Sequence, residues 1–308
     1  MNKKLFILTG PTAVGKTSVA IDLARKLDGE VISADSMQIY KYMDIGTAKV
    51  KPDEMKGIPH YLIDIIYPDE NFTVSDYKKQ AMKCIKKINQ GNKLPIVVGG
   101  TGLFINSLVY KLNFGNVPPN KAIRSRLETY DNEYLHSKLM EIDEISGEKI
   151  SIRDRKRIIR ALEIWEVSGK IPSSHNNNFR KETDEYDLAM VCLNMDRGRL
   201  YQRINDRVDI MIESGLVAEV KNILDMGYDK DMVSMQGIGY KEIIMYLEDK
   251  INLDESIDII KQRSRNYAKR QLTWFKRDNR IKWIDIDNFD SVDEINNSIE
   301  NYIYQKLR

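Results

Sequence analysis

The first chemistry that this sequence suggests is phosphate binding. Residues 10–17 read GPTAVGKT, which matches a glycine-rich phosphate-binding loop and lies between a strand-like and a helix-like segment. In such a loop the backbone amides point at phosphate oxygens, and the lysine adds a mobile positive charge. The hydroxyl of the final threonine could also bind Mg²⁺. The expected phosphate site therefore comprises Gly10, Pro11, Thr12, Ala13, Val14, Gly15, Lys16 and Thr17, with Thr17 as the metal ligand.

Asp35 is the second candidate for chemistry. It follows an apolar segment, residues 30–34, and is the only carboxylate at an expected strand end near the loop. A carboxylate there could act as a general base, or it could hold Mg²⁺ as in small-molecule kinases. Most phosphate-loop NTPases place a further metal-binding Asp after another strand. Here the strand expected at residues 94–98 is followed by Gly-Gly-Thr-Gly, which offers no carboxylate.

The elements that must position these residues alternate in type. Apolar runs predict strands at residues 4–9, 30–34, 94–98 and 187–193. Helical periodicity predicts helices at residues 14–27, 200–214, 216–226, 239–247 and 254–274. A further helix should begin after Thr73 and stop at Gly91, with Tyr77, Ala81, Ile85 and Ile88 on its apolar face. The alternation indicates an α/β fold with a P-loop NTPase-like core, in which helices flank a parallel sheet.

The composition and periodicity of the chain change after Lys111. A break rich in Pro, Gly and Asn covers residues 113–119, and residues 122–169 are charged and helical in periodicity. Residues 172–178 are polar and loop-like. We therefore expect residues 1–114 and 186–308 to form the α/β core with C-terminal helices, and residues 115–185 to form a mostly helical inserted domain.

Charge is distributed unevenly along the chain. The net charge is only +2, but residues 261–282 hold nine basic residues and one acid. The following residues, 283–308, hold six acids and two basic residues. The basic block could bind a polyanion or could be a solvated helix face, and charge alone does not decide between the two.

The cysteines and the apolar runs indicate the cellular compartment of the protein. Cys84 and Cys192 are far apart in the sequence and are expected to be buried thiols in a reducing compartment, with no zinc site. The apolar run at residues 5–8 is too short for a signal peptide, and no 18-residue apolar stretch occurs. We therefore expect a cytoplasmic protein without membrane contact. No catalytic role is assigned to the three isolated histidines, His60, His136 and His175.

Several motifs in a fixed order resemble the tRNA dimethylallyltransferase (IPP transferase) family, in its bacterial form without a C-terminal zinc finger. The phosphate loop and residues 35–49, DSMQIYKYMDIGTAK, carry the resemblance most specifically. Residues 99–104, 154–163, 200–209, 237–242 and 265–274 are similar to further family segments. Two departures occur: Phe104 replaces the usual Tyr, and Ile152-Arg153 replaces the usual Pro-Asn, which affects the local turn.

The resemblance implies a prenyl transfer reaction. The donor would be dimethylallyl diphosphate, whose diphosphate occupies the phosphate loop in place of ATP. The acceptor would be the exocyclic amine of the adenosine on the 3′ side of the anticodon, in tRNAs that read codons beginning with U. A carboxylate such as Asp35 would take the amine's proton, while loop amides, Lys16, Mg²⁺ and an arginine would stabilise the leaving diphosphate. We expect a monomer that binds the anticodon stem-loop and extrudes the target base.

The resemblance also places residues at the RNA. The residues expected to contact tRNA are Asp35, Ser36, Met37, Gln38, Thr101, Arg124, Arg157 and Arg160. Arg153, Arg157 and Arg160 should share one face of a helix, although a solvated charge stripe would give the same pattern. Arg203 and Arg207 are candidates for the diphosphate, and the sequence does not choose between them. Aromatic residues at helical spacing are more often core than base-stacking platforms, so Tyr267 and Trp274 are expected in the core.

Two other functions compete with this hypothesis. A small-molecule kinase would use Asp35 as its base or metal ligand, but the second strand-end Asp is missing. An RNA-binding protein with a phosphate loop would bind tRNA without forming product. Diphosphate synthases are excluded as a class, because they bind Mg²⁺ through Asp-Asp-x-x-Asp and this sequence has no adjacent Asp pair.

Overall fold

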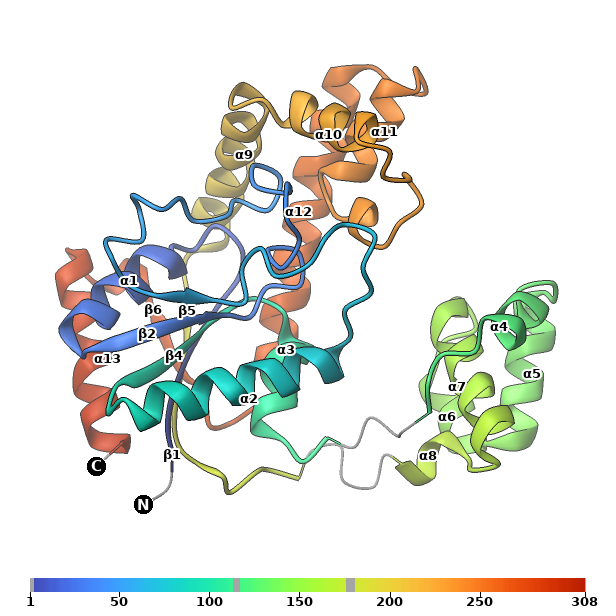
Figure 1. Ribbon diagram of the computed structural model, residues 1–308, viewed down its shortest axis with the longest axis horizontal. Helices are drawn as coiled ribbons and strands as arrows, with labels where there is room; N and C mark the ends of the chain where they lie inside the picture. The colour runs from blue at the N-terminus through green and yellow to red at the C-terminus, as the bar shows by residue number, and fades with distance from the viewer. Residues whose placement is uncertain (1–2, 113–116, 176–180, 308) are drawn as a thin grey trace. The chain divides into compact units, whose positions relative to one another are not determined.

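The computed structural model describes residues 3–112, 117–175 and 181–307. They divide into two compact units (Figure 1). Unit 1 comprises Met1–Leu108 and Asp184–Arg308, and unit 2 comprises Val109–Thr183. Within the described ranges, no helix is both long enough and apolar enough to cross a membrane.

Unit 1 is built on a parallel sheet that has six strands in the described residues. The strands are β1 Lys3–Thr9, β2 Gly29–Ser33, β3 His60–Tyr61, β4 Leu94–Gly99, β5 Tyr186–Asn194 and β6 Lys282–Asp285. Their order is β3-β2-β4-β1-β5-β6, and each neighbouring pair is parallel. The loops after β1, β2 and β4 therefore all leave the sheet at its carboxyl edge, which is where ligands bind in open α/β sheets.

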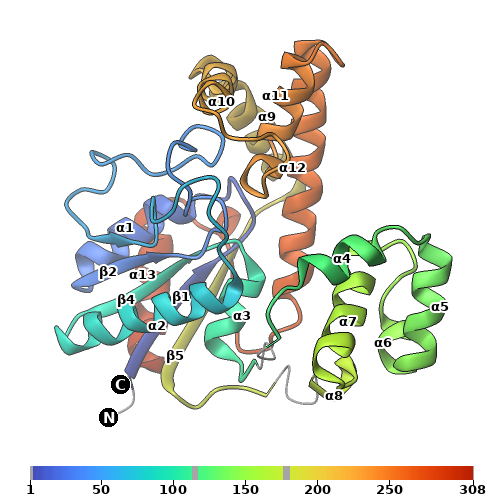
Figure 2. The same ribbon diagram turned by 45° about the vertical axis from the view of Figure 1, so that its right-hand side comes forward.

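Helices cover both faces of this sheet (Figure 2). On one face, α1 (Lys16–Lys26) and α13 (Val292–Lys306) pack in one cluster with Phe6 and Leu8 of β1. The alternate residues of β1, Leu5 and Ile7, are also fully buried and point to the other face. There lie α2 (Val74–Gln90) and α3 (Gly102–Val109), which meet where Tyr77 stacks on Phe104 at 4.0 Å. The predicted α/β fold is thus confirmed.

A second group of helices extends the core beyond the sheet. It consists of α9 Arg197–Glu213, α10 Leu216–Asp225, the short η1 Ser234–Gln236, α11 Tyr240–Leu247 and α12 Leu253–Phe275. Two of them bridge separate hydrophobic clusters: α9 buries Ile204 with the sheet and Val208 with α10 and α11, and α12 does the same with Ala268 and Ile260. These two helices can therefore hold side chains over the edge of the sheet.

Unit 2 is a small helical unit. Its helices are α4 Lys121–Leu127, α5 Asn132–Ile142, α6 Glu144–Lys149, α7 Arg155–Ser168 and α8 Pro172–His175. They enclose a core of Leu127, Leu135, Leu139, Ile158 and Leu162. The unit begins earlier than residue 115 because the chain at Tyr110 and Lys111 pairs with the chain at 181–182.

Several local expectations can be compared with the structure. Helix α2 is capped by Thr73 and followed by Gly91, and its four predicted apolar residues are buried. Strands β3 and β6 and helices α3 and α13 were not expected, since they are short or lie in charged segments. Residues 172–175 form a helical turn where a loop was expected, and 176–178 lie outside the described residues. Cys192 is buried as expected, but Cys84 is only half-buried because it lies beside the apolar face of α2.

The capping of α2 can be tested by mutation. Asp76 N–H donates to the Thr73 hydroxyl at 3.2 Å, and Thr73 N–H donates to the Asp76 carboxylate at 2.9 Å. Thr73→Ala removes the hydroxyl and should lower the free energy of unfolding by about 1 kcal/mol. Thr73→Ser keeps it and should stay close to wild type in urea denaturation. Equal losses in both variants would contradict the capping role.

Candidate active site

A cavity of about 730 Å³ opens at the carboxyl edge of the sheet in unit 1. The phosphate loop contributes Thr12, Ala13, Gly15, Lys16 and Thr17 to its lining. The loop after β2 contributes Asp35 and Gln38, and α9 contributes Arg203 and Arg207. The structure thus brings together candidate residues that are almost two hundred positions apart in the sequence. The other residues predicted for the site, namely Gly10, Pro11, Val14, Ser36, Met37 and Thr101, support the lining without forming part of it.

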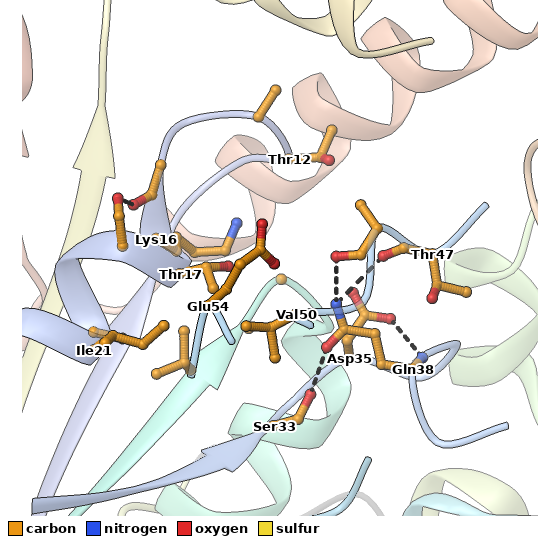
Figure 3. Close-up of a pocket in the computed structure, with 18 of the residues that line it drawn as sticks. Thr12, Lys16, Thr17, Ile21, Ser33, Asp35, Gln38, Thr47, Val50 and Glu54 are labelled. Atoms are coloured by element: carbon orange, nitrogen blue, oxygen red, sulfur yellow. Dashed lines mark hydrogen bonds between the residues drawn. The ribbon is translucent and has the colours of Figure 1, made fainter. Parts of the chain in front are cut away.

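Lys16 is held inside the phosphate loop by the loop's own carbonyls. Its Nζ donates to the carbonyl oxygens of Gly10 at 3.1 Å and Pro11 at 2.8 Å. Figure 3 shows its ammonium pointing into the cavity beside Thr17. Burial lowers the pKa of Lys16 to about 8, and the charge of Arg207 acts in the same direction, while Asp35 opposes both. The ammonium is therefore poised to gain stabilisation from a bound anion.

Arg203 and Arg207 lie one turn apart on α9 and both face the cavity. A Cβ placed on Gly15 would lie 3.8 Å from the guanidinium of Arg203, so this arginine lies against the phosphate loop. Burial lowers the pKa of Arg207, while the Asp35 carboxylate acts to raise it. Both arginines line the same cavity as Lys16 and Lys56, which is an arrangement suited to a polyphosphate.

Asp35 is oriented by the turn that follows β2. Its Oδ1 accepts from the N–H of Met37 at 2.8 Å and from that of Gln38 at 3.4 Å. Both of the hydrogen bonds found for this carboxylate in the described residues go to Oδ1, which leaves Oδ2 free to accept from a substrate. The carboxylate acts electrostatically on Lys16, Arg207 and Tyr267. A fixed carboxylate beside an anion site can accept a proton from a group that attacks a bound phosphate ester.

Gln38 and Thr101 connect the loops around Asp35. Gln38 lies at the cavity wall, and its amide bonds Ser33 and the carbonyls of Thr47 and Ala48 (Figure 3). Thr101 follows β4, and its hydroxyl accepts the N–H of Ser36 at 3.0 Å. Thr101 therefore acts on the cavity through the β2 loop, and the tRNA contact expected of it stays a prediction.

Gln271 of α12 was missed by sequence reasoning, although it joins two of these loops. Its Oε1 accepts from the N–H of Thr12 at 2.9 Å, and its Nε2 donates to the carbonyl of Gly100 at 3.1 Å. The side chain is buried and lines the cavity. A glutamine within the motif of residues 265–274 was the available signal, but a single sequence does not indicate which loops it reaches.

The expectation that Tyr267 belongs to the core is wrong. Tyr267 lies one turn before Gln271 on α12 and lines the cavity. Burial and the Asp35 carboxylate raise the pKa of Tyr267 to about 12, while hydrogen bonds with Thr101 and Gln271 oppose them. Trp274 is half-buried against Gly102, where a Cβ would lie 2.3 Å from its ring. Periodicity places both aromatic residues on an inner face, but it does not reveal that part of this face borders a cavity.

Three further cavity residues were also missed. Glu54 lies in the loop after β2, Asp206 on α9 between the two arginines, and His60 on β3. Figure 3 shows the Glu54 carboxylate turned towards Lys16 and Thr17. Burial lowers the pKa of His60, whose ring contacts the carbonyl of Ile58 at 2.8 Å. The helical spacing of Arg203, Asp206 and Arg207 could have revealed Asp206, whereas Glu54 carried no signal.

In unit 2, two candidate arginines are engaged with a buried carboxylate. Arg124 and Arg160 donate to Glu163, which is fully buried. Burial by itself would raise the pKa of Glu163, but these hydrogen bonds hold it below its usual range. Arg160 also donates to the carbonyl of Val117 at 2.8 Å. These arginines therefore have a structural role whether or not they meet RNA.

Arg157 and Arg153 are arranged differently. Helix α7 begins at Arg155 with Asp154 as its N-cap, so Arg153 precedes the helix and does not share the predicted face. Arg157 is exposed, and its guanidinium lies 3.4 Å from the Asp154 carboxylate. Such an exposed pair contributes little to stability. Arg157 therefore remains the predicted arginine whose charge is most accessible to a partner.

Part of the basic block is paired within unit 1. Lys261 bridges to Asp209 at 2.6 Å, and Arg263 pairs with the buried Glu242. Arg265 donates to Asn205 of α9 at 2.6 Å. The first half of the block therefore joins α12 to its neighbours, which favours a structural role over a polyanion-binding face for these three residues.

The lowered pKa of Lys16 predicts how anion binding depends on pH. Bound diphosphate favours the charged ammonium, so affinity for inorganic diphosphate should fall as pH rises above about 8, by up to about tenfold per pH unit. Lys16→Arg keeps its charge over this range and should bind without that fall. Titration calorimetry from pH 6.5 to 10 measures both curves. If affinity depends on pH in the same way in wild type and in Lys16→Arg, Lys16 does not bind the anion.

Comparison with known proteins agrees with this geometry. Residues 38–278 match the family described as IPP transferase. The chain is 51% identical to the tRNA dimethylallyltransferase of Clostridioides difficile (strain 630), covering 99% of this chain and 98% of that protein. It is 48% identical to the protein of the same name from Acetivibrio thermocellus, with 97% of each chain covered.

Solved structures give the same result. The tRNA isopentenylpyrophosphate transferase of Bacillus halodurans superposes with a TM-score of 0.74 at 43% identity, covering 99% of this chain and 98% of that one. A eukaryotic dimethylallyltransferase acting on tRNA superposes with a TM-score of 0.85 at 30% identity, covering 99% of this chain and 80% of that chain. The matched motifs, the arrangement of the phosphate loop and these similarities agree: the chain belongs to the IPP transferase family.

Proposed function

We propose that the protein transfers the dimethylallyl group of dimethylallyl diphosphate to the exocyclic amine of an adenosine in tRNA and releases diphosphate. The adenosine is the one on the 3′ side of the anticodon in tRNAs that read codons beginning with U. The observation that carries this proposal is the composition of the cavity. It combines the cations Lys16, Arg203 and Arg207 and the fixed carboxylate of Asp35 with an apolar wall of Ala20, Ile21, Val31, Val50, Ile63 and Val98.

The two parts of the cavity suit the two parts of the donor. The diphosphate would take the loop amides, Lys16, Arg203 and Arg207, whereas the five-carbon chain would lie against the aliphatic side chains. A nucleoside triphosphate such as ATP would place its polar sugar against the aliphatic wall of the cavity, which disfavours the kinase alternative. Both arginines are assigned to the diphosphate because both line the cavity.

The same region fits a divalent cation. The Thr17 hydroxyl and the Glu54 carboxylate lie together at the cavity wall, and Mg²⁺ prefers such oxygen ligands along with phosphate oxygens. When bound, Mg²⁺ would offset negative charge that develops on the leaving diphosphate. Burial destabilises the charged form of Lys16. The ammonium is therefore stabilised further as negative charge grows on the diphosphate.

Asp35 is the group assigned to the proton. The adenine amine is a weak nucleophile because its lone pair is delocalised into the ring, and it must lose a proton as the new carbon–nitrogen bond forms. Oδ1 of Asp35 is held by two backbone amides, so Oδ2 can face the amine. The proton moves from the amine to Asp35, and the bonding electrons of the broken carbon–oxygen bond leave with diphosphate.

The helical unit 2 is proposed to bind the anticodon stem-loop. Its arginines supply phosphate contacts, and the target base must leave its stack to reach the cavity. We assign Arg157 to the RNA backbone, and Arg124 and Arg160 both to the RNA and to Glu163. The groups assigned here belong to one chain, so we expect a monomer, acting in the cytoplasm where tRNA is found.

Incubation with labelled donor and total tRNA tests the proposal. Labelled prenyl-adenosine after digestion would support it. Phosphoryl transfer from ATP without prenylation would favour a kinase, and tRNA binding without product would favour an RNA-binding protein.

The role of Asp35 can be tested with an isosteric change. Asp35→Asn should keep the fold and tRNA affinity, because Asn can still accept the backbone N–H bonds. It cannot take a proton, and general-base contributions are about 10²- to 10⁴-fold, so the single-turnover rate should fall by that amount. Single turnover with saturating tRNA and donor measures it.

A Mg²⁺ series separates the two roles considered for Asp35. A defect that eases at high Mg²⁺, with weaker donor binding, would make Asp35 a metal ligand instead. A single-turnover rate of Asp35→Asn within about threefold of wild type would exclude Asp35 as the general base.

Arg157 gives a test of RNA binding by unit 2. Arg157→Gln should weaken tRNA binding and reduce the slope of log K against log salt by about 0.9 or less, because one phosphate contact is lost. Arg199→Gln, an equally exposed arginine of unit 1, serves as the matched control and should leave the slope unchanged. Filter binding at four salt concentrations is sufficient. Equal slopes for wild type and Arg157→Gln would exclude this contact.

A further inference from the structure

Glu219 of α10 fills a concave site formed by three successive backbone amides. Its Oε2 accepts from the N–H groups of Asp44 at 2.9 Å and Ile45 at 2.7 Å, and its Oε1 accepts from Gly46 at 3.0 Å. Successive amides that converge in this way form a nest that binds anions. The carboxylate of α10 therefore anchors the loop at residues 44–48, which is far from it in the sequence.

Tyr240 of α11 completes this anchor. Its hydroxyl donates to Oε1 of Glu219 at 2.7 Å, and its ring is fully buried. Burial and the nearby Glu219 carboxylate raise the pKa of Tyr240 above its ordinary value, so the hydroxyl keeps its proton. A Cβ on Gly46 would lie 2.5 Å from the ring, so only glycine allows the loop to approach this closely. The loop is thus fixed by both a polar contact and a steric fit.

The anchored loop in turn fixes the amide of Gln38. Gln38 Nε2 donates to the carbonyls of Thr47 at 3.3 Å and Ala48 at 3.5 Å, while Oε1 accepts from the Ser33 hydroxyl at 3.1 Å. Carbonyl oxygens can only accept, so the nitrogen must face the loop. The group that Gln38 can still offer to the cavity is therefore the second lone pair of Oε1, and the side chain acts towards a ligand as an acceptor only.

We propose that Glu219 is a positioning residue that, by holding loop 44–48, keeps Gln38 as a hydrogen-bond acceptor for the substrate base and so selects adenine over guanine. The 6-position of adenine carries an amine, which can donate to Oε1 while its other proton goes to Asp35. The 6-position of guanine carries an oxygen, which would face Oε1 with no proton between them. This inference rests on the proposed function and adds the base selectivity of the same site.

The test uses anticodon stem-loops that differ only in the target base. Wild type should prenylate the adenosine loop and bind the guanosine loop weakly as a competitor. Glu219→Gln introduces an NH₂ group that must oppose backbone N–H groups in the nest. We expect this variant to lower the single-turnover rate about tenfold and to shrink the adenosine-over-guanosine affinity ratio about fivefold. Affinity for inorganic diphosphate should not change, because the phosphate loop is untouched.

Two further variants separate positioning from general destabilisation. Glu242→Gln is the matched control, since Glu242 is a buried carboxylate of α11 that accepts the N–H of Gly239 at 2.7 Å and does not hold loop 44–48. It should lower the melting temperature while keeping the affinity ratio. Tyr240→Phe keeps the ring against Gly46 and loses only the hydroxyl, so it should change the ratio in the same direction by a smaller factor.

A double-mutant cycle decides whether Glu219 acts through Gln38. Gln38→Met removes the acceptor directly, and adding Glu219→Gln to it should reduce the ratio no further. Three outcomes would each overturn the inference. The two changes could lower the affinity ratio additively, Glu219→Gln could leave the ratio unchanged, or Glu242→Gln could lower it as much as Glu219→Gln does. Absence of any prenylated product from wild type would instead overturn the proposed function, so the two failures are distinguishable.

Discussion

The cavity exists because a single amide side chain holds two loops of the sheet edge together. Gln271 accepts from the phosphate loop at Thr12 and donates to the loop after β4 at Gly100. Thr101, the residue after Gly100, in turn holds the loop after β2, because its hydroxyl accepts the N–H of Ser36 and its own N–H donates to the carbonyl of Ala34. One turn of α12 therefore fixes all three loops relative to one another. Both partners of Gln271 are backbone groups, so this contact constrains the amide orientation as well as the distance.

The same cavity gathers charges that would repel one another if left alone. Lys16, Arg203 and Arg207 converge, and the pKa of Lys16 falls to about 8 mainly because of burial, with Arg207 as a further cause. Asp35 offsets part of this cost for both Lys16 and Arg207. A bound anion offsets the remaining repulsion between these cations. It does so most strongly in the transition state, where its negative charge increases. This difference between ground and transition states is what a leaving diphosphate requires.

The sequence predicted those features that depend on local spacing. The phosphate loop, the cap at Thr73 and the apolar face of α2 follow from patterns within a few residues, and each is present. Gln271 and Glu54 were missed because their roles depend on which distant loop they meet. Tyr267 was wrongly expected in the core, because helical spacing cannot show that part of a helix face borders a cavity. Arg153 was misplaced because the helix begins only at Arg155, with Asp154 as its N-cap.

The end of β4 explains why the carboxylate of this site follows β2. Phosphate-loop NTPases place a metal-binding Asp at the end of such a neighbouring strand. Here a Cβ at Gly99 would lie 2.2 Å from the carbonyl oxygen of Ala34, so this position cannot carry any side chain. The space is filled by the backbone of the β2 turn, which the N–H of Thr101 binds at 3.1 Å. The close approach that excludes an Asp from β4 is therefore also the contact that sets Asp35 beside Lys16, where a proton acceptor serves an alkyl transfer.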